Sequence, residues 1–171
     1  EAIRRGHAKL IDTGELYGNE EIIQKAIASS GTQVVLSSKH GTWCEGELPE
    51  EVTSQVPDEY KKMKLRGLYP TSRGTLGRGV CIGGAKEVTA ALHFTLKRLG
   101  VSAIDIYLLH WPLTHSAYDL DDSSHSATRL DAWKAMIALR DKGYVKSIGV
   151  SNFSPRHVEE LIAAKLEAPT I

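Results

Sequence analysis

Short apolar runs alternate with amphipathic stretches along most of the chain. Runs typical of buried strands occupy residues 8–13, 33–38, 103–109 and 144–150. Stretches with apolar residues at helical spacing predict helices over residues 19–30, 85–99, 130–142 and 154–165. Residues 169–171 are predicted to begin a fifth strand. Strands that alternate with helices pair in parallel through crossover helices, so the pattern predicts an α/β fold.

The predicted helices carry start and stop signals. Asn19 is expected to cap the first helix, and Gly31 is expected to end it. Ser154 is expected to cap the last helix, with Pro155 at its first position. The apolar stripe of the first helix is expected to consist of Ile22, Ile23, Ala26 and Ile27.

Helical and strand periodicity is absent from two polar segments. Residues 40–84 are rich in Gly, Pro, Ser and Thr, and their acidic residues precede their basic ones. Because such a long loop is uncommon in a compact domain, we interpret it as an insertion after a strand, within a single domain over residues 1–171. A second polar loop is predicted over residues 114–128.

Each predicted strand ends at an unusual polar residue. The four strands lead to Asp12, Lys39, His110 and Asn152, and Tyr17 follows Asp12 after a short turn. The carboxyl ends of parallel strands meet at one edge of the sheet, where barrel enzymes and open α/β sheets bind their ligands. We therefore expect these side chains to share one site.

The side chains in this set suit the reduction of a carbonyl group by a hydride donor. Such a reaction needs a proton donor and stabilisation of the growing oxyanion. A tyrosine hydroxyl, with an ordinary pKa of about 10, becomes a better acid beside a lysine ammonium. A buried lysine in turn needs a carboxylate partner. Tyr17, Lys39 and Asp12 fit these three roles, and His110 can orient the carbonyl oxygen.

Four segments of the chain resemble the aldo-keto reductase superfamily. Residues 12–20 read Asp-Thr-Gly-Glu-Leu-Tyr-Gly-Asn-Glu and resemble its active-site segment. Lys39 follows Val-Val-Leu-Ser-Ser as the family's lysine follows its apolar strand. Residues 108–112, Leu-Leu-His-Trp-Pro, resemble another family segment, and residues 146–153 are similar to a family signature at all eight positions. The resemblance covers most of the chain outside the insertion.

This resemblance implies a catalytic tetrad and a fold. The tetrad consists of Asp12, Tyr17, Lys39 and His110. The implied fold is a partial (β/α)8 TIM barrel that lacks the first strand and the C-terminal strands of the family. The implied reaction is the reduction of an aldehyde or ketone to an alcohol by NAD(P)H, as in NADP-dependent alcohol dehydrogenases, with Tyr17 as the proton donor.

The resemblance also implies residues that contact the cofactor and the substrate. Ser151 and Asn152 correspond to residues that hydrogen-bond the nicotinamide carboxamide, and Asp12 and Thr13 are expected to border the cofactor. Trp111 is expected to line the substrate pocket. The implied cofactor is NADP in preference to NAD, and no metal is expected.

Two departures from the family pattern lie near the proposed tetrad. The family often has Gly-Tyr-Arg-His before its Ile-Asp, whereas residues 7–10 here read His-Ala-Lys-Leu, with Gly6 one place early. Gly14 stands where the family usually has Ala or Ser, which is expected to loosen the turn that carries Tyr17. Both changes leave the reacting groups in place.

Charge balance, apolar run length and cysteine content limit the expected partners and the expected cellular location. Lys and Arg together number 21, as do Asp and Glu, so no net charge points to nucleic acid. No apolar run approaches the roughly 18 residues of a membrane span. Cys44 and Cys81 do not form a disulfide framework, so we expect no bridge and a cytoplasmic location. The expected partner is a small-molecule carbonyl compound, and the sequence does not indicate an oligomeric state.

Three further interpretations compete with the enzyme. A nicotinamide-binding regulatory subunit can keep the same fold without useful turnover. The chain can also be an inactive truncated fragment, because residues 1–6 read as a helix end and residues 168–171 as a strand start. A metal site would use His110, His115 and His125, but no cysteine joins them, and we expect solvated loop histidines instead.

Overall fold

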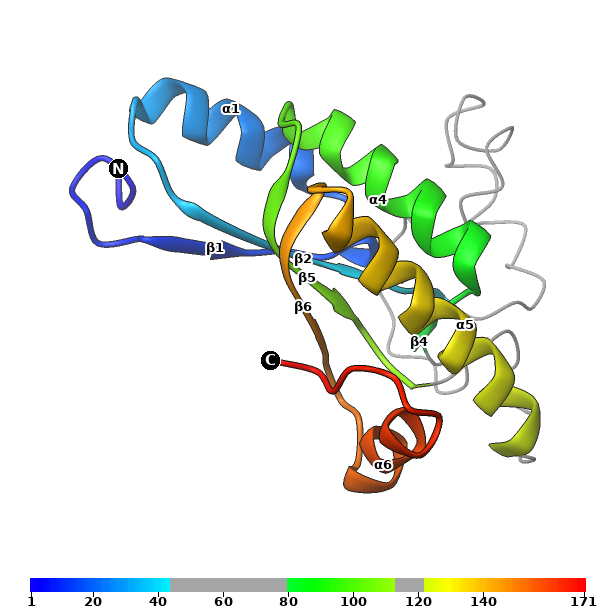
Figure 1. Ribbon diagram of the computed structural model, residues 1–171. Helices are drawn as coiled ribbons and strands as arrows, with labels where there is room; N and C mark the ends of the chain where they lie inside the picture. The colour runs from blue at the N-terminus through cyan, green and yellow to red at the C-terminus, as the bar shows by residue number, and fades with distance from the viewer. Residues whose placement is uncertain (44–79, 113–121) are drawn as a thin grey trace, which may run out of the picture.

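The computed structural model describes residues 1–43, 80–112 and 122–171 (Figure 1). Four parallel strands form one sheet in the order β1-β2-β5-β6. Their bounds are Leu10–Asp12 for β1, Val35–His40 for β2, Ile104–Leu109 for β5 and Val145–Val150 for β6. The sequence predicted these four strands, and the parallel α/β fold is confirmed.

Three helices connect the strands and cover one face of the sheet, namely α1 (Glu20–Ser30), α4 (Ala85–Leu99) and α5 (Asp122–Asp141). The short helix η1 (Glu15–Tyr17) follows β1, and α6 (Pro155–Ala163) follows β6. Figure 1 shows α4 between α1 and α5 on the same side of the sheet. Helix α4 has the predicted bounds, and Ser154 and Pro155 open α6 as expected.

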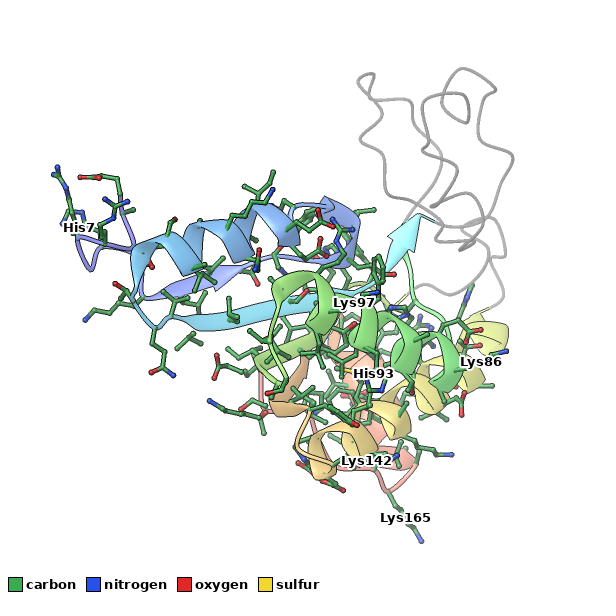
Figure 2. All side chains as sticks on the ribbon, turned by 90° about the horizontal axis from the view of Figure 1, so that it is seen from above. His7, Lys86, His93, Lys97, Lys142 and Lys165 are labelled. Carbon is green, nitrogen blue, oxygen red and sulfur yellow. The ribbon has the colours of Figure 1, made fainter. Side chains whose placement is uncertain are left out.

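The hydrophobic core lies between the sheet and these helices. On α4, the buried positions Val88, Leu92 and Leu96 recur at helical spacing and face the sheet. Figure 2 shows Lys86, His93 and Lys97 on the same helix, and all three are exposed to solvent. The core also contains large side chains from the strands and from α5, namely Leu36, Tyr107, Leu109, Ile148, Trp133 and Met136.

The opposite face of the sheet carries the proposed site and is more open. Side chains alternate between the two faces along a strand, so Leu36 on β2 points into the core and Ser37 and Lys39 point toward the opposite face. There Lys39 reaches Asp12 on β1. Leu10 and Val35, which are register partners at the amino ends of β1 and β2, are 49% and 41% exposed. The sheet therefore has one packed face and one open face near β1.

Helix α5 begins at Asp122, eight residues before the predicted start at residue 130. The sequence prediction was wrong here because residues 122–129 are polar and show no apolar stripe. The first turns are held by polar contacts instead. Arg129, only 1% exposed, donates to the carboxylate of Glu160 on α6 and to the carbonyl of Pro112. Residues 114–121 of the predicted loop lie outside the described residues.

Helix α1 confirms its predicted bounds, but its surface differs from the prediction. Ile23 and Ile27 pack against the core, whereas Ile22 is 71% exposed and Ala26 is exposed. The helix packs on α4 at one side only, so its buried stripe is narrow. Asn19 occupies the N-cap position without making a side-chain cap bond, because its Oδ1 accepts a hydrogen bond from Thr13 Oγ1 at 2.5 Å.

The ends of the predicted insertion meet in a short ladder. Strands β3 (Thr42–Trp43) and β4 (Val80–Cys81) pair antiparallel directly after β2 and before α4. Residues 44–79 lie outside the described residues. Because Cys44 is among them, the expectation of no Cys44–Cys81 bridge stays a prediction. Strand β2 continues through His40, the first residue of the predicted insertion.

The C-terminal residues lie beside β6 without forming the predicted fifth strand. Ile171 accepts a hydrogen bond from the Val150 amide at 3.0 Å, and Thr170 Oγ1 donates to the Ile148 carbonyl at 2.9 Å. Gly149 permits this approach, since a Cβ at this position would lie 2.4 Å from the Ile171 carbonyl oxygen. Two hydrogen bonds hold the segment, and no regular ladder is recorded for it among the described strands.

Candidate active site

Asp12 and Lys39 form an ion pair at the carboxyl end of the first two strands. The parallel register places Asp12 beside Ser37, two residues before Lys39 on the same face. Lys39 Nζ lies 2.5 Å from Asp12 Oδ2 and donates to the Thr13 carbonyl at 2.9 Å, while Ser37 Oγ donates to Asp12 Oδ1 at 2.8 Å. The Lys39 side chain is 9% exposed and that of Asp12 is 47% exposed. A nearly buried ammonium is thus matched by a carboxylate that solvent can still reach.

Tyr17 reaches this pair from the short η1 turn. Its amide donates to the Gly14 carbonyl at 2.8 Å, and Gly18 reverses the chain behind it with φ of 59°. Lys39 Nζ lies 5.4 Å from the centroid of the Tyr17 ring. Tyr17 is 48% exposed, so the phenol is accessible from solvent while its inner side faces the ammonium.

His110 completes the predicted group from the end of β5. Its ring meets that of Tyr17 edge-on, with centroids 5.7 Å apart. The residue is buried, and its Nδ1 has no hydrogen-bond partner among the residues that the structure describes. Burial and the nearby charge of Lys39 lower the pKa of His110 from 6.5 to about 4, against the opposing pull of Asp12. The imidazole is therefore neutral at pH 7 and can donate or accept a hydrogen bond without carrying charge.

The lowered pKa of His110 makes stability depend on pH in a defined window. Unfolding returns this pKa from about 4 to 6.5, so the unfolded chain binds more protons between these values. The contribution of His110 to stability is present above pH 6.5 and is expected to decline as the pH falls toward 4. Titration of the His110 ring by NMR, alongside denaturant unfolding at several pH values, checks both parts. A ring that titrates near pH 6.5 in the folded protein would contradict this prediction.

Ser151 and Asn152 lie at the end of β6, next to β5. Asn152 Nδ2 donates to the His110 carbonyl at 2.8 Å and to Ser151 Oγ at 3.0 Å, and the Ser151 amide donates to the Leu109 carbonyl at 2.8 Å. Asn152 has a positive φ of 60°, which asparagine tolerates better than most residues. The structure thus brings the predicted amide and hydroxyl to the same edge as His110.

The two remaining predicted residues differ in their accessibility. Trp111 directly follows His110 and is 38% exposed, which leaves part of its indole open at this edge. Thr13 is fully buried; its hydroxyl donates to Asn19 and its carbonyl accepts from Lys39. Contacts of either residue with a substrate or cofactor stay predictions.

The histidines considered for a metal site do not behave as solvated loop residues. His110 and His125 are 6% and 3% exposed, and His125 belongs to α5. The expectation was wrong for His125 because α5 begins earlier than its polar sequence indicated, and wrong for His110 because the end of β5 is buried. His115 lies outside the described residues. Within the described residues, no group of three or more His, Cys, Asp or Glu side chains is arranged to hold a metal ion.

Glu15 and His40 belong to the neighbourhood of the site, although the sequence analysis did not single them out. His40 Nδ1 lies 2.9 Å from Glu15 Oε2, and both side chains are almost fully buried. Each stands close in sequence to a predicted site residue, Tyr17 or Lys39. Adjacency was the only available signal, since a polar pair separated by 25 positions leaves no pattern in a single sequence.

The sequence predicts that Gly14 loosens the turn that carries Tyr17, and a substitution at Gly14 tests this. Its φ of −170° and ψ of 150° are open to any residue, and an added Cβ would lie 3.5 Å from the Tyr17 ring and 3.6 Å from Lys39 Cβ. Gly14→Ala is therefore expected to raise the free energy of unfolding by about 0.4–1 kcal/mol, chiefly by restricting the unfolded chain. Denaturant unfolding measures the change. A loss of stability would show that the turn needs a conformation closed to alanine.

The chain forms a parallel sheet with helices between its strands, and polar side chains gather at the carboxyl ends of these strands. This is the edge at which α/β barrels and open α/β sheets bind their ligands. The family model "Aldo/keto reductase family" matches residues 82–171. The chain belongs to this family, as the sequence motifs indicated. No helix within the described ranges has the length and apolar character needed to cross a membrane.

Individual relatives agree with this assignment over most of the chain. An aldo-keto reductase of Mycolicibacterium vanbaalenii is 28% identical over 170 residues, which cover 99% of this chain and 44% of that protein. Methylglyoxal reductase DkgA of Salmonella typhimurium is 40% identical over 86 residues, 50% of this chain and 28% of that protein. The chain thus spans less than half the length of these curated relatives.

Solved structures show the same relation in three dimensions. An aldo/keto reductase from Brucella melitensis superimposes with a TM-score of 0.64 at 27% identity, covering 98% of this chain and 49% of that one. The reductase MGS-M4 from a deep-sea metagenome gives a TM-score of 0.59 at 26% identity and is covered to 44%. These relatives are (β/α)8 barrels, and the prediction of a partial barrel is confirmed.

Proposed function

We propose that this chain forms part of the active site of a nicotinamide-dependent oxidoreductase that reduces aldehyde or ketone groups to alcohols. The observation that carries the proposal is the meeting of Asp12, Lys39, Tyr17 and His110 at one edge of the sheet. Membership in the aldo-keto reductase family supports the reaction class. The particular residue roles and the preference for NADP over NAD are parts of the proposal.

The nicotinamide, when bound, supplies the hydride. The chain's own residues then have to place the carbonyl group and protonate its oxygen. The neutral His110 ring can hydrogen-bond the carbonyl oxygen without a charge of its own at pH 7. Tyr17 gives its hydroxyl proton to that oxygen, and the Lys39 ammonium beside the ring stabilises the negative charge left on the phenol. The Asp12 carboxylate pairs with the nearly buried Lys39 and compensates the burial of its ammonium.

The residues proposed to hold the nicotinamide fit it in chemical kind. Ser151 and Asn152 offer a hydroxyl and an amide beside the His110 carbonyl, and both types of group pair well with a carboxamide. Asn152 is exposed and Ser151 is half-buried, so solvent-borne ligands can reach them. Asp12 and Thr13 are proposed to border the same ligand, and Trp111 is proposed to contact the substrate. A silkworm aldo-keto reductase with the same fold was solved in complex with NADP, at 23% identity.

Coenzyme binding and turnover test this proposal together. NADPH and NADH are titrated separately into the purified protein and followed by fluorescence, and aldehyde reduction is then measured over many turnovers. Methylglyoxal is a suitable first probe, because a relative at 40% identity over half of this chain is a methylglyoxal reductase. Saturable binding that is tighter for NADPH, with turnover, supports the proposal. Binding without turnover favours the regulatory alternative, and failure of the folded protein to bind either coenzyme contradicts both.

A further inference from the structure

The buried Glu15–His40 pair lies beside the proposed tetrad without belonging to it. The side chains of Glu15 and His40 are 8% and 5% exposed, and Glu15 Oε2 also accepts a hydrogen bond from the Gly41 amide at 3.3 Å. On the other side of the ring, the Gly83 amide donates to His40 Nε2 at 3.0 Å. The Glu15 carboxylate and both ring nitrogens of His40 thus have hydrogen-bond partners inside the protein.

These partners fix the proton arrangement of His40. A backbone amide can only donate, so His40 Nε2 must accept and must carry no proton. The ring proton then resides on Nδ1, where it is donated to Glu15 Oε2. An imidazole held in this tautomer accepts on one side and donates on the other, and it therefore links two specific groups in one orientation.

The pair joins three segments that the chain order keeps apart. Glu15 belongs to η1, His40 ends β2, and Gly83 lies just before α4. Tyr17 is two residues after Glu15, and Lys39 directly precedes His40. A bond between Glu15 and His40 therefore ties the turn that carries the proposed proton donor to the strand end that carries its charged neighbour.

Other hydrogen bonds around the η1 turn hold its flanks: Lys39 donates to the Thr13 carbonyl, and Arg98 donates to the Gly18 carbonyl at 3.0 Å. The turn is three residues long, and glycines stand on both sides of it at positions 14 and 18. The Tyr17 ring is half exposed, so packing restrains it only on its inner side. Proton donation requires that the hydroxyl be placed to within a fraction of an ångström, and misplacement by about 1 Å can cost about 100-fold in rate.

We propose that Glu15 and His40 are positioning residues that hold Tyr17 against Lys39 and His110. The inference rests on the proposed function for its effect on catalysis, while its structural part can be measured without turnover. Neither residue touches the reacting atoms in this assignment. Their removal should therefore lower the rate of the chemical step and leave the binding of coenzyme nearly unchanged.

Kinetics of matched variants test the catalytic part. Glu15→Ala and His40→Ala are each expected to lower kcat about 10- to 100-fold, with the KM for NADPH changed by less than about twofold. The double variant should lose little more than either single one, because both remove the same link. Glu15→Gln keeps an oxygen that accepts from His40 and should retain most of the activity. Ile104→Val, a core change at the amino end of β5, is the control for a loss of stability alone.

NMR tests the positioning directly. The wild-type protein should show His40 protonated at Nδ1 only, together with a nuclear Overhauser contact between the rings of Tyr17 and His110, whose centroids are 5.7 Å apart. That contact should vanish in Glu15→Ala and His40→Ala, and it should persist in Ile104→Val. Persistence of the contact in both Glu15→Ala and His40→Ala would overturn the inference. So would a kcat per folded molecule in these variants equal to that of the wild type. If the wild type lacks turnover but the contact depends on Glu15, only the proposed function has failed.

Discussion

Replacing Tyr17 with Phe is expected to lower kcat about 10²- to 10⁴-fold, while the Kd for NADPH changes by less than about twofold. The range is the usual contribution of a well-placed general acid. The substitution removes only the hydroxyl, so the ring keeps its edge contact with His110 and its place near Lys39. Because half of the Tyr17 surface is exposed, the free energy of unfolding should change little. Steady-state reduction of methylglyoxal and coenzyme titration by fluorescence measure the two effects.

Tyr144→Phe is the matched control for this variant. Tyr144 packs edge-on against His93 at the amino end of β6, the end opposite to the proposed site, and loss of its hydroxyl should leave kcat unchanged. Turnover by Tyr17→Phe at the wild-type rate would remove Tyr17 from the role of proton donor. The other members of the group would then need another source for the proton.

The Asp12–Lys39 pair is expected to respond differently to the loss of each partner. Lys39→Met removes the charge that faces the Tyr17 ring and should lower kcat about 10²- to 10³-fold, the usual cost of losing one group that stabilises developing charge. The loss of stability should be small, about 1 kcal/mol: methionine fills a similar volume and Asp12 stays open to solvent and bonded to Ser37, but the Thr13 carbonyl loses its bond from Lys39. The kinetic effect is thus expected to exceed the unfolding effect.

Asp12→Asn is expected to have the larger effect on stability. It leaves the Lys39 ammonium, 9% exposed, without a carboxylate, and the free energy of unfolding should fall by about 1–3 kcal/mol. The half-open setting of Asp12 keeps this cost below that of a fully buried pair. Denaturant unfolding of both variants, beside their kcat values, checks the contrast. Equal loss of stability in the two variants would mean that the pair serves the fold and not the charge beside Tyr17.

The sequence could predict that the proposed site residues meet at one sheet edge, because they follow predictable strands. Asp12, His110 and Asn152 come at or just after strand ends, and parallel strands gather such positions at one edge. Helix α4 was equally predictable, since its apolar stripe and the glycine after it agree. These features depend on local spacing, which a single sequence displays directly.

Features that depend on contacts between distant polar residues could not be predicted in this way. The early start of α5 rests on the bonds of Arg129 to Glu160 and Pro112, and these are invisible to a search for apolar periodicity. The bond between Glu15 and His40 is hidden for the same reason. The approach of Ile171 to Gly149 depends on the missing side chain of one glycine in a strand that otherwise reads as ordinary.

The order of the strands has a consequence for how the site comes into being during folding. Of the three pairings in the parallel sheet, β2 with β5 joins the residues most distant in sequence, as Ser37 meets Ile106. Asp12, Tyr17 and Lys39 lie on one side of that junction, and His110 and Asn152 lie on the other. Closing so long a stretch of chain carries the largest entropic cost of the three pairings. The two halves of the site therefore meet only when this remote pairing has formed, and the chemistry belongs to the assembled sheet and to no smaller part of it.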